Sequence, residues 1–207
     1  MTEKKKYTSR FGASTVGKMA NPDGGGLSIQ FYSLGTGQRA EFAAFVSDFT
    51  DSFASNWNQQ QIFGRMDPVM NIIGTTRNLS LSFSVPAYSI AGARSNLAEV
   101  NKLAQFLYPT YRTAGSHSTV KGNPLVKVQF QNLIASGKNS LALNKAFDLD
   151  SSKNGLIVAI TSLSYSPDFE QGVLGNSGMQ FPKVWNVNMS MQVLHDHTLD
   201  AKELKIW

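Results

Sequence analysis

Residues 78–85 read NLSLSFSV, and apolar side chains alternate there with serines: Leu79, Leu81, Phe83 and Val85. A period of two is typical of a β-strand that buries one face and leaves the other in contact with water or a partner. The same period returns at residues 184–193, which read VWNVNMSMQV. Both stretches are therefore predicted to be strands whose second face carries small, uncharged polar groups.

Three further strands are predicted at residues 27–34, 125–133 and 155–165, where β-branched and aromatic residues lie between Gly, Pro and Asn. Residues 40–53 fit two patterns. Phe42, Phe45, Phe49 and Phe53 have the spacing of a helical face, whereas Phe42, Ala44 and Val46 have that of a strand. We expect a strand over residues 40–48.

One helix is predicted between Ser89 and Leu107, because apolar residues recur there at spacings of three and four, with Ser89 as the N-cap and Pro109 beyond the end. One helix among six to eight strands predicts a mainly β fold, a β-sandwich or partly closed barrel with one flanking α-helix. Polar or Gly-rich composition predicts long connections at residues 139–154 and 170–180.

Most of the positive charge lies at the start of the chain. The formal net charge is +5, and residues 1–20 hold five basic residues and one acidic residue. We therefore divide the chain into a flexible basic N-terminal arm, residues 1–26, and one β domain, residues 27–207. The arm, with Lys4, Lys5, Lys6 and Arg10, is either a solvated tail or a segment that orders on a neighbouring subunit or an acidic surface.

The near-neutral remainder lacks the convergent basic side chains that follow a phosphate backbone, so no sequence-specific nucleic acid binding is expected. Membrane insertion is not expected either, because no run reaches the roughly 18 apolar residues needed to span a bilayer.

Catalytic and metal-binding patterns are weak. The chain has no cysteine, which excludes disulfides and thiolate chemistry. Its histidines are His117, His195 and His197; the last two share a strand face, but Asp200 is the only nearby third ligand. A calcium loop at Asp148 lacks the Gly and Glu that such a loop requires. We expect no catalytic residues, no metal site and no cofactor.

Residues 48–83 combine aromatic, charged, Gly and Pro residues in several short motifs: DFTDSF at 48–53, Trp57, FGRMDP at 63–68 and GTTRNLSLSF at 74–83. Arg65, Asp67 and Arg77 are expected to form a charged cluster at the end of two neighbouring strands. Two readings of that cluster stay open, an ion pair that locks a corner of the fold and a contact between subunits.

This arrangement resembles the tail-tube-like baseplate proteins of contractile-tailed bacteriophages, namely the tube initiator and tube-junction proteins. The similarity covers roughly residues 27–199. It continues through the predicted helix and through LYPTY at 107–111, GNPLVKV at 122–128, FPKVW at 181–185 and VLHDH at 193–197.

The resemblance implies a structural virion subunit of the tail baseplate, assembled in the host cytoplasm. It implies a homo-oligomeric ring, a hexamer, that initiates or joins the tail tube above the central hub. The implied partners are the tail tube protein, baseplate hub proteins and a tape-measure protein in the channel. The subunit-interface residues are then expected among Lys4, Lys5, Lys6, Arg10, Arg65, Asp67 and Arg77.

A second class of function stays open, a glycan- or peptidoglycan-binding β-sandwich module of the tail tip. Such modules stack sugars on exposed aromatic residues, and the tryptophans here are Trp57, Trp185 and Trp207. The strand pattern places Trp185 on a core face, which favours the ring-forming subunit.

Overall fold

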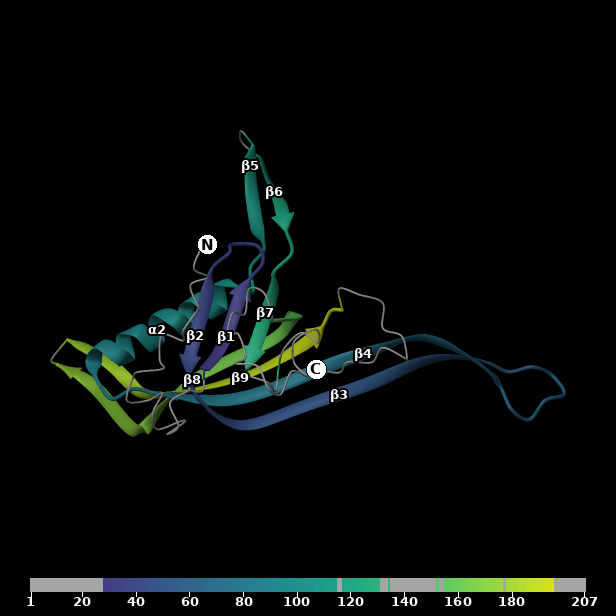
Figure 1. Cartoon of the computed structure of the whole chain (residues 1–207), viewed down its shortest axis with the longest axis horizontal. Coiled ribbons are helices and arrows are strands. Elements are labelled where there is room, and N and C mark those ends of the chain that lie inside the picture. Colours follow the sequence, from purple (N-terminus) through teal and green to yellow (C-terminus); the bar gives the residue numbers. More distant parts are fainter. Residues whose placement is uncertain are drawn as a thin grey trace, which may run out of the picture.

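The computed structural model describes residues 28–114, 117–130, 134, 152, 155–176 and 178–195. Figure 1 shows a large curved sheet, a helix on one side of it and three hairpins that project from the body. The elements in chain order are β1 Ser28–Ser33, β2 Arg39–Ala43, β3 Phe45–Gln60, β4 Val69–Pro86, α2 Ile90–Gln105, β5 Thr110–Ala114, β6 His117–Gly122, β7 Leu125–Phe130, β8 Leu156–Asn176 and β9 Met179–Val193.

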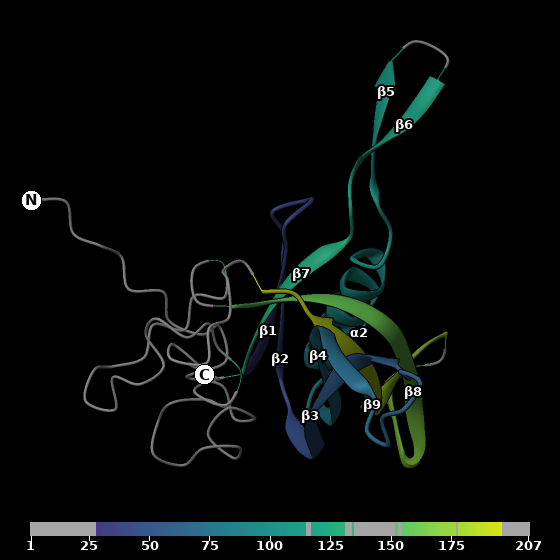
Figure 2. The same ribbon diagram turned by 90° about the vertical axis from the view of Figure 1, so that its right-hand side faces the viewer.

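Seven strands form one sheet in the order β2-β1-β7-β8-β9-β4-β3, and every neighbouring pair is antiparallel. The edge strands β2 and β3 are consecutive in the chain, joined through the buried Ala44. A one-residue link between the two edges requires the sheet to curl, and Figure 2 shows this curl along the direction of the β3–β4 hairpin.

The core lies inside the curl. Phe31 of β1, Phe42 of β2 and Phe83 of β4 form an aromatic cluster with ring centroids 5.7–6.5 Å apart, although β1 and β4 are not neighbours in the sheet. Two parts of one sheet thus face each other across the core, as the layers of a sandwich do. The alternating residues predicted to be buried in β4 and β9 are all buried.

The helix α2 packs against β2, β8 and β9 through Val100 and Leu103. Its N-terminus is capped by Ser89, whose Oγ accepts a hydrogen bond from the Gly92 N–H at 3.1 Å. Lys102 on α2 pairs with Glu99 at 3.0 Å and donates to the Arg39 carbonyl. These contacts fix the helix on one side of the sheet.

The predicted mainly β fold with one flanking helix is confirmed, whereas the sheet is not closed into a barrel, because β2 and β3 do not pair with each other. The strand expected at residues 40–48 is instead two strands that bend at Ala44. The helical reading of the phenylalanines in this segment is wrong.

The loop predicted at residues 170–180 is also wrong, since β8 and β9 continue into a hairpin there. Gly172, Gly175 and Gly178 have positive φ, so they allow an irregular hairpin with a register shift in place of a long connection. The predicted connection at 139–154 lies outside the described residues, except for Ser152. Within the described residues, no helix is long and apolar enough to cross a membrane.

Candidate subunit interface

One face of the β8–β9–β4–β3 part of the sheet consists almost entirely of small uncharged polar side chains. Strand pairing places them in rows, of which two are Ser162–Ser190–Ser80–Thr50 and Ser164–Asn188–Ser82–Asp48. All of these side chains are exposed or half-buried, and Asp48 is the only charged one in the two rows. The face has no basic groups with which to hold a phosphate backbone.

The same four strands end in two free edges. β3 is paired only with β4, along Phe45–Gln60, and the pairing of β8 with β7 stops at Ala159. Beyond Ala159, no other described strand pairs with that side of β8. Because neighbours alternate in direction, the two outer strands β3 and β8 run in opposite directions. Unpaired edges of this length are sites for pairing with another chain.

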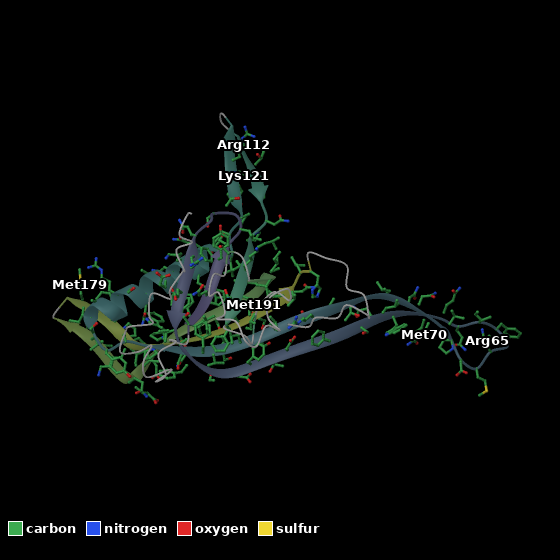
Figure 3. The ribbon with its side chains drawn as sticks, in the orientation of Figure 1. Arg65, Met70, Arg112, Lys121, Met179 and Met191 are labelled. Atoms are coloured by element: carbon green, nitrogen blue, oxygen red, sulfur yellow. The ribbon has the colours of Figure 1, made fainter. Side chains whose placement is uncertain are left out.

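The β3–β4 hairpin extends well beyond its neighbours in the sheet. The last pair between β4 and β9 is Asn78 with Gln192, so Val69–Arg77 of β4 lie past the end of β9. At about 3.3 Å per residue this overhang is about 30 Å long. We call residues 53–77 the free hairpin; Figure 3 shows Met70 and Arg65 near its end.

The free hairpin carries a large set of exposed apolar side chains. Phe53 and Trp57 lie on the face of β3 that is buried within the body, Ile72 lies opposite Trp57, and all three are exposed here. At the turn, Phe63 and Met66 are 105% and 97% exposed. The further exposed members are Ile62, Met70 and Ile73. Exposed apolar surface of this extent is typical of sites that bind another protein, a membrane or a ligand.

A buried ion pair lies where the free hairpin leaves the body. Arg77 Nη2 donates to Asp51 Oδ2 at 2.6 Å, and Arg77 Nε contacts both carboxylate oxygens at 3.0 and 3.1 Å. The side chains are only 6% and 11% exposed, and the Arg77 guanidinium lies 5.2 Å from the centre of the Phe53 ring. This pair fixes two strands at the base of the hairpin.

Arg65 and Asp67 do not join that cluster. Both lie at the exposed turn of the hairpin, whereas Arg77 lies eight residues along β4 from its first residue, Val69, or about 26 Å. The predicted three-residue cluster is therefore wrong in its membership: the partner of Arg77 is Asp51. Neither interpretation, an ion pair that locks a corner or a contact between subunits, therefore applies to these three residues as one cluster. A role of Arg65, Asp67 or Arg77 in a subunit contact stays a prediction.

Several candidate residues cannot be placed. Lys4, Lys5, Lys6, Arg10, Asp148, His197, Asp200 and Trp207 lie outside the described residues, and so does the side chain of His117. Among the described residues, no group of three or more His, Asp or Glu side chains is arranged to hold a metal ion.

The exposed apolar set of the free hairpin is what the sequence interpretation missed. Its signal was present, because Phe53 and Trp57 lie four residues apart and share a strand face with the partly buried Phe49. The intervening Asp51 and Ser55 on that same face concealed the period of two.

Neither a protein-family model nor a curated protein matches the chain. Among solved structures, it is similar to a chain described as the tail of an empty GTA particle with C6 symmetry. The two are 12% identical with a TM-score of 0.33, over 84% of this chain and 96% of that one. Similarity at this level does not establish a common fold.

Proposed function

We propose that the chain is a non-catalytic structural subunit of a phage tail that closes with copies of itself into a ring around a channel. The observation that carries this proposal is the four-stranded β8–β9–β4–β3 sheet, which has two free edges of opposite direction and one polar face that is almost uncharged.

Head-to-tail pairing removes both free edges. When β3 of one copy lies beside β8 of the next, the antiparallel alternation continues and the polar faces stay on the same side of the sheet. A symmetric pairing of β3 with β3 would leave both β8 edges open. A ring is the closed arrangement that leaves neither the β3 edge nor the β8 edge available for aggregation.

The polar face lines the channel in this arrangement, because α2 and the β5–β6 hairpin lie on the other side of the sheet (Figure 1). Six copies, each adding four strands about 4.8 Å apart, give a circumference of about 115 Å and a backbone diameter of about 37 Å. Such a channel is wide enough for duplex DNA. The rows that line it carry no basic group and only one charged side chain, Asp48, so a polyanion passes without ion-pair contacts.

The sequence motifs that resemble tube-initiator and tube-junction proteins support a more specific role within the tail. We propose a baseplate ring that initiates or joins the tail tube above the central hub, with the tape-measure protein in its channel. The basic arm, with Lys4, Lys5, Lys6 and Arg10, is then expected to reach a neighbouring subunit.

The glycan-binding alternative receives less support. Trp185 is buried, at 7% exposure, and the half-exposed Trp57 lies opposite Ile72 on a hairpin that also exposes Met66 and Met70. Mixed aromatic, aliphatic and Met surfaces are typical of contacts between proteins.

The test uses disulfide cross-linking, for which the absence of native cysteine is an advantage. Thr50→Cys on β3 is combined in turn with Ser162→Cys, Ser164→Cys and Ser166→Cys on β8. Directly opposite strand residues have Cβ atoms 4.5–5.5 Å apart, close to disulfide geometry. Oxidation is expected to give a ladder of covalent oligomers for at least one combination, ending at the ring size measured by native mass spectrometry.

Thr50→Cys alone is the matched control, because head-to-tail pairing keeps the Thr50 residues of different copies apart. A dimer cross-linked through this single cysteine would show symmetric β3–β3 pairing. That result, or a protein that stays monomeric by native mass, would refute the ring.

A further inference from the structure

We infer that Glu99 and Lys102 of α2 close the outer edge of β2 against pairing with another chain, and that they thereby restrict self-assembly to the β3 and β8 edges. The closing of the β2 edge follows from contacts within one copy. Its consequence for assembly rests on the proposed ring.

β2 is an edge strand, with β1 as its only neighbour in the seven-stranded sheet. The Gln38 carbonyl, just before β2, accepts a hydrogen bond from the Ser33 N–H of β1 at 2.9 Å. Main-chain groups in an antiparallel pair point alternately toward and away from the partner strand. Those of Arg39 and Glu41 therefore point away from β1. An outward row of this kind is a template for pairing with another strand.

The outward groups of β2 bond instead to two side chains of α2, which lies beside β2 (Figure 1). The Glu41 N–H donates to Glu99 Oε2 at 3.4 Å, and Lys102 Nζ donates to the Arg39 carbonyl at 3.1 Å. Glu99 and Lys102 also pair with each other at 3.0 Å. One acceptor and one donor thus lie where an added strand would place its own carbonyl and N–H groups.

These two residues belong to a polar stripe on the side of α2 that faces the strands. Asn96, Glu99 and Lys102 recur at a spacing of three, and Asn96 Nδ2 donates to the Pro86 carbonyl at the end of β4 at 3.2 Å. Asn96 and Glu99 are only 7% and 6% exposed. Apolar side chains at buried positions often stabilise a fold as well as an ion pair does. The stripe therefore selects particular main-chain partners, which an apolar stripe would leave unsatisfied.

Closing β2 removes a competitor of β3. Because strand directions alternate across the sheet, β2 and β3 run in the same direction, and both are antiparallel to β8. An open β2 edge would pair with the β8 edge of another copy in the same sense as β3 does in the proposed ring. β3, in contrast, is mostly exposed along Phe45–Gln60 and pairs with β4 on one side. Covering one edge with a helix is a way in which sheet proteins prevent wrong pairing.

Hydrogen exchange tests the closing of the edge. Glu99→Ala/Lys102→Ala removes both side-chain partners, so exchange of the Glu41 amide should rise about tenfold or more relative to the β1 amides that pair with β7. Glu99→Gln keeps an oxygen that can accept from the Glu41 N–H and should retain most of the protection. Arg94→Ala/Asn101→Ala, on the exposed face of the same helix, is the matched control and should leave exchange unchanged.

Native mass spectrometry and thioflavin T fluorescence of the full chain measure the consequence for assembly. The unmodified protein and the control variant should give the same closed oligomer. Glu99→Ala/Lys102→Ala should give additional, larger species of no fixed size that bind thioflavin T. Lys102→Met removes only the donor to the Arg39 carbonyl and keeps an apolar stem. It should show the same change to a smaller extent, so the test holds even where the double variant does not fold.

Unchanged exchange of the Glu41 amide in Glu99→Ala/Lys102→Ala would overturn the closing of the edge. Faster exchange with the oligomer distribution of the control variant would overturn the effect on assembly. An unmodified protein that does not cross-link between β3 and β8 would instead refute the proposed ring, and the exchange measurement would still decide whether α2 closes the β2 edge.

Discussion

Replacing Asp51 by asparagine should destabilise the base of the free hairpin strongly. The substitution keeps the size of the side chain but leaves the Arg77 guanidinium, 6% exposed, without its carboxylate. Removing one partner of a buried ion pair costs about 3–5 kcal/mol. Because Asp51 is 11% exposed and lies near the end of the core, we expect the lower end, about 3 kcal/mol. For a chain of this length that corresponds to a fall in Tm of roughly 6–12 °C.

Urea denaturation followed by tryptophan fluorescence measures this loss, with Ser80→Ala as the control. Ser80 lies on the exposed polar face of β4, and its removal should change the free energy of unfolding by about 0.5 kcal/mol or less. The double variant Asp51→Leu/Arg77→Met removes both charges and should be more stable than Asp51→Asn alone. If Asp51→Asn unfolds within about 0.5 kcal/mol of the unmodified protein, the pair does not stabilise the hairpin base and the reasoning fails.

Three further changes test the packing of the body and its ends. Phe83→Ala removes a ring from the aromatic cluster and should cost about 3–5 kcal/mol in urea denaturation; a loss below about 1 kcal/mol would show that the curled sheet does not depend on it. Ser89→Ala removes the N-cap of α2 and should cost about 1 kcal/mol, whereas Ser89→Asp should retain most of the stability. Gly175→Ala would place a Cβ 1.9 Å from the Met179 carbonyl oxygen. It should increase hydrogen exchange at the β8–β9 end with little change in global Tm, and unchanged exchange there would contradict the hairpin geometry.

The sequence predicted those strands and the helix in which one face is buried along the whole element, because apolar residues then recur with a regular period. Leu79, Leu81, Phe83 and Val85 face the core at every second position, so the strand period is visible without a structure. The helix was predictable for the same reason, because its apolar stripe and its Ser89 cap both lie in one local segment.

The free hairpin could not be predicted because no described part of the chain buries either of its apolar-bearing faces. Beyond Arg77 the apolar and polar residues of β4 no longer alternate, and the register shift at Trp57 breaks the period again. The partner of Arg77 was missed for a related reason. Asp51 is 26 residues away, and only the register of two long strands brings the two side chains together.

The β8–β9 end was misread because glycines usually mark connections. Here Gly172, Gly175 and Gly178 supply positive φ within or at the turn of a hairpin, and local composition does not distinguish that use from a loop.

In the proposed ring, β3 of one copy pairs with β8 of the next and the polar face lines a channel. A cryo-electron microscopy map of the purified protein assembly, at a resolution that separates strands, tests it most directly. We expect a closed ring with a continuous antiparallel wall, in which Ser80, Ser190 and Ser162 point into the lumen. A map of isolated monomers or two-fold dimers, or a ring whose lumen is lined by α2, would contradict it.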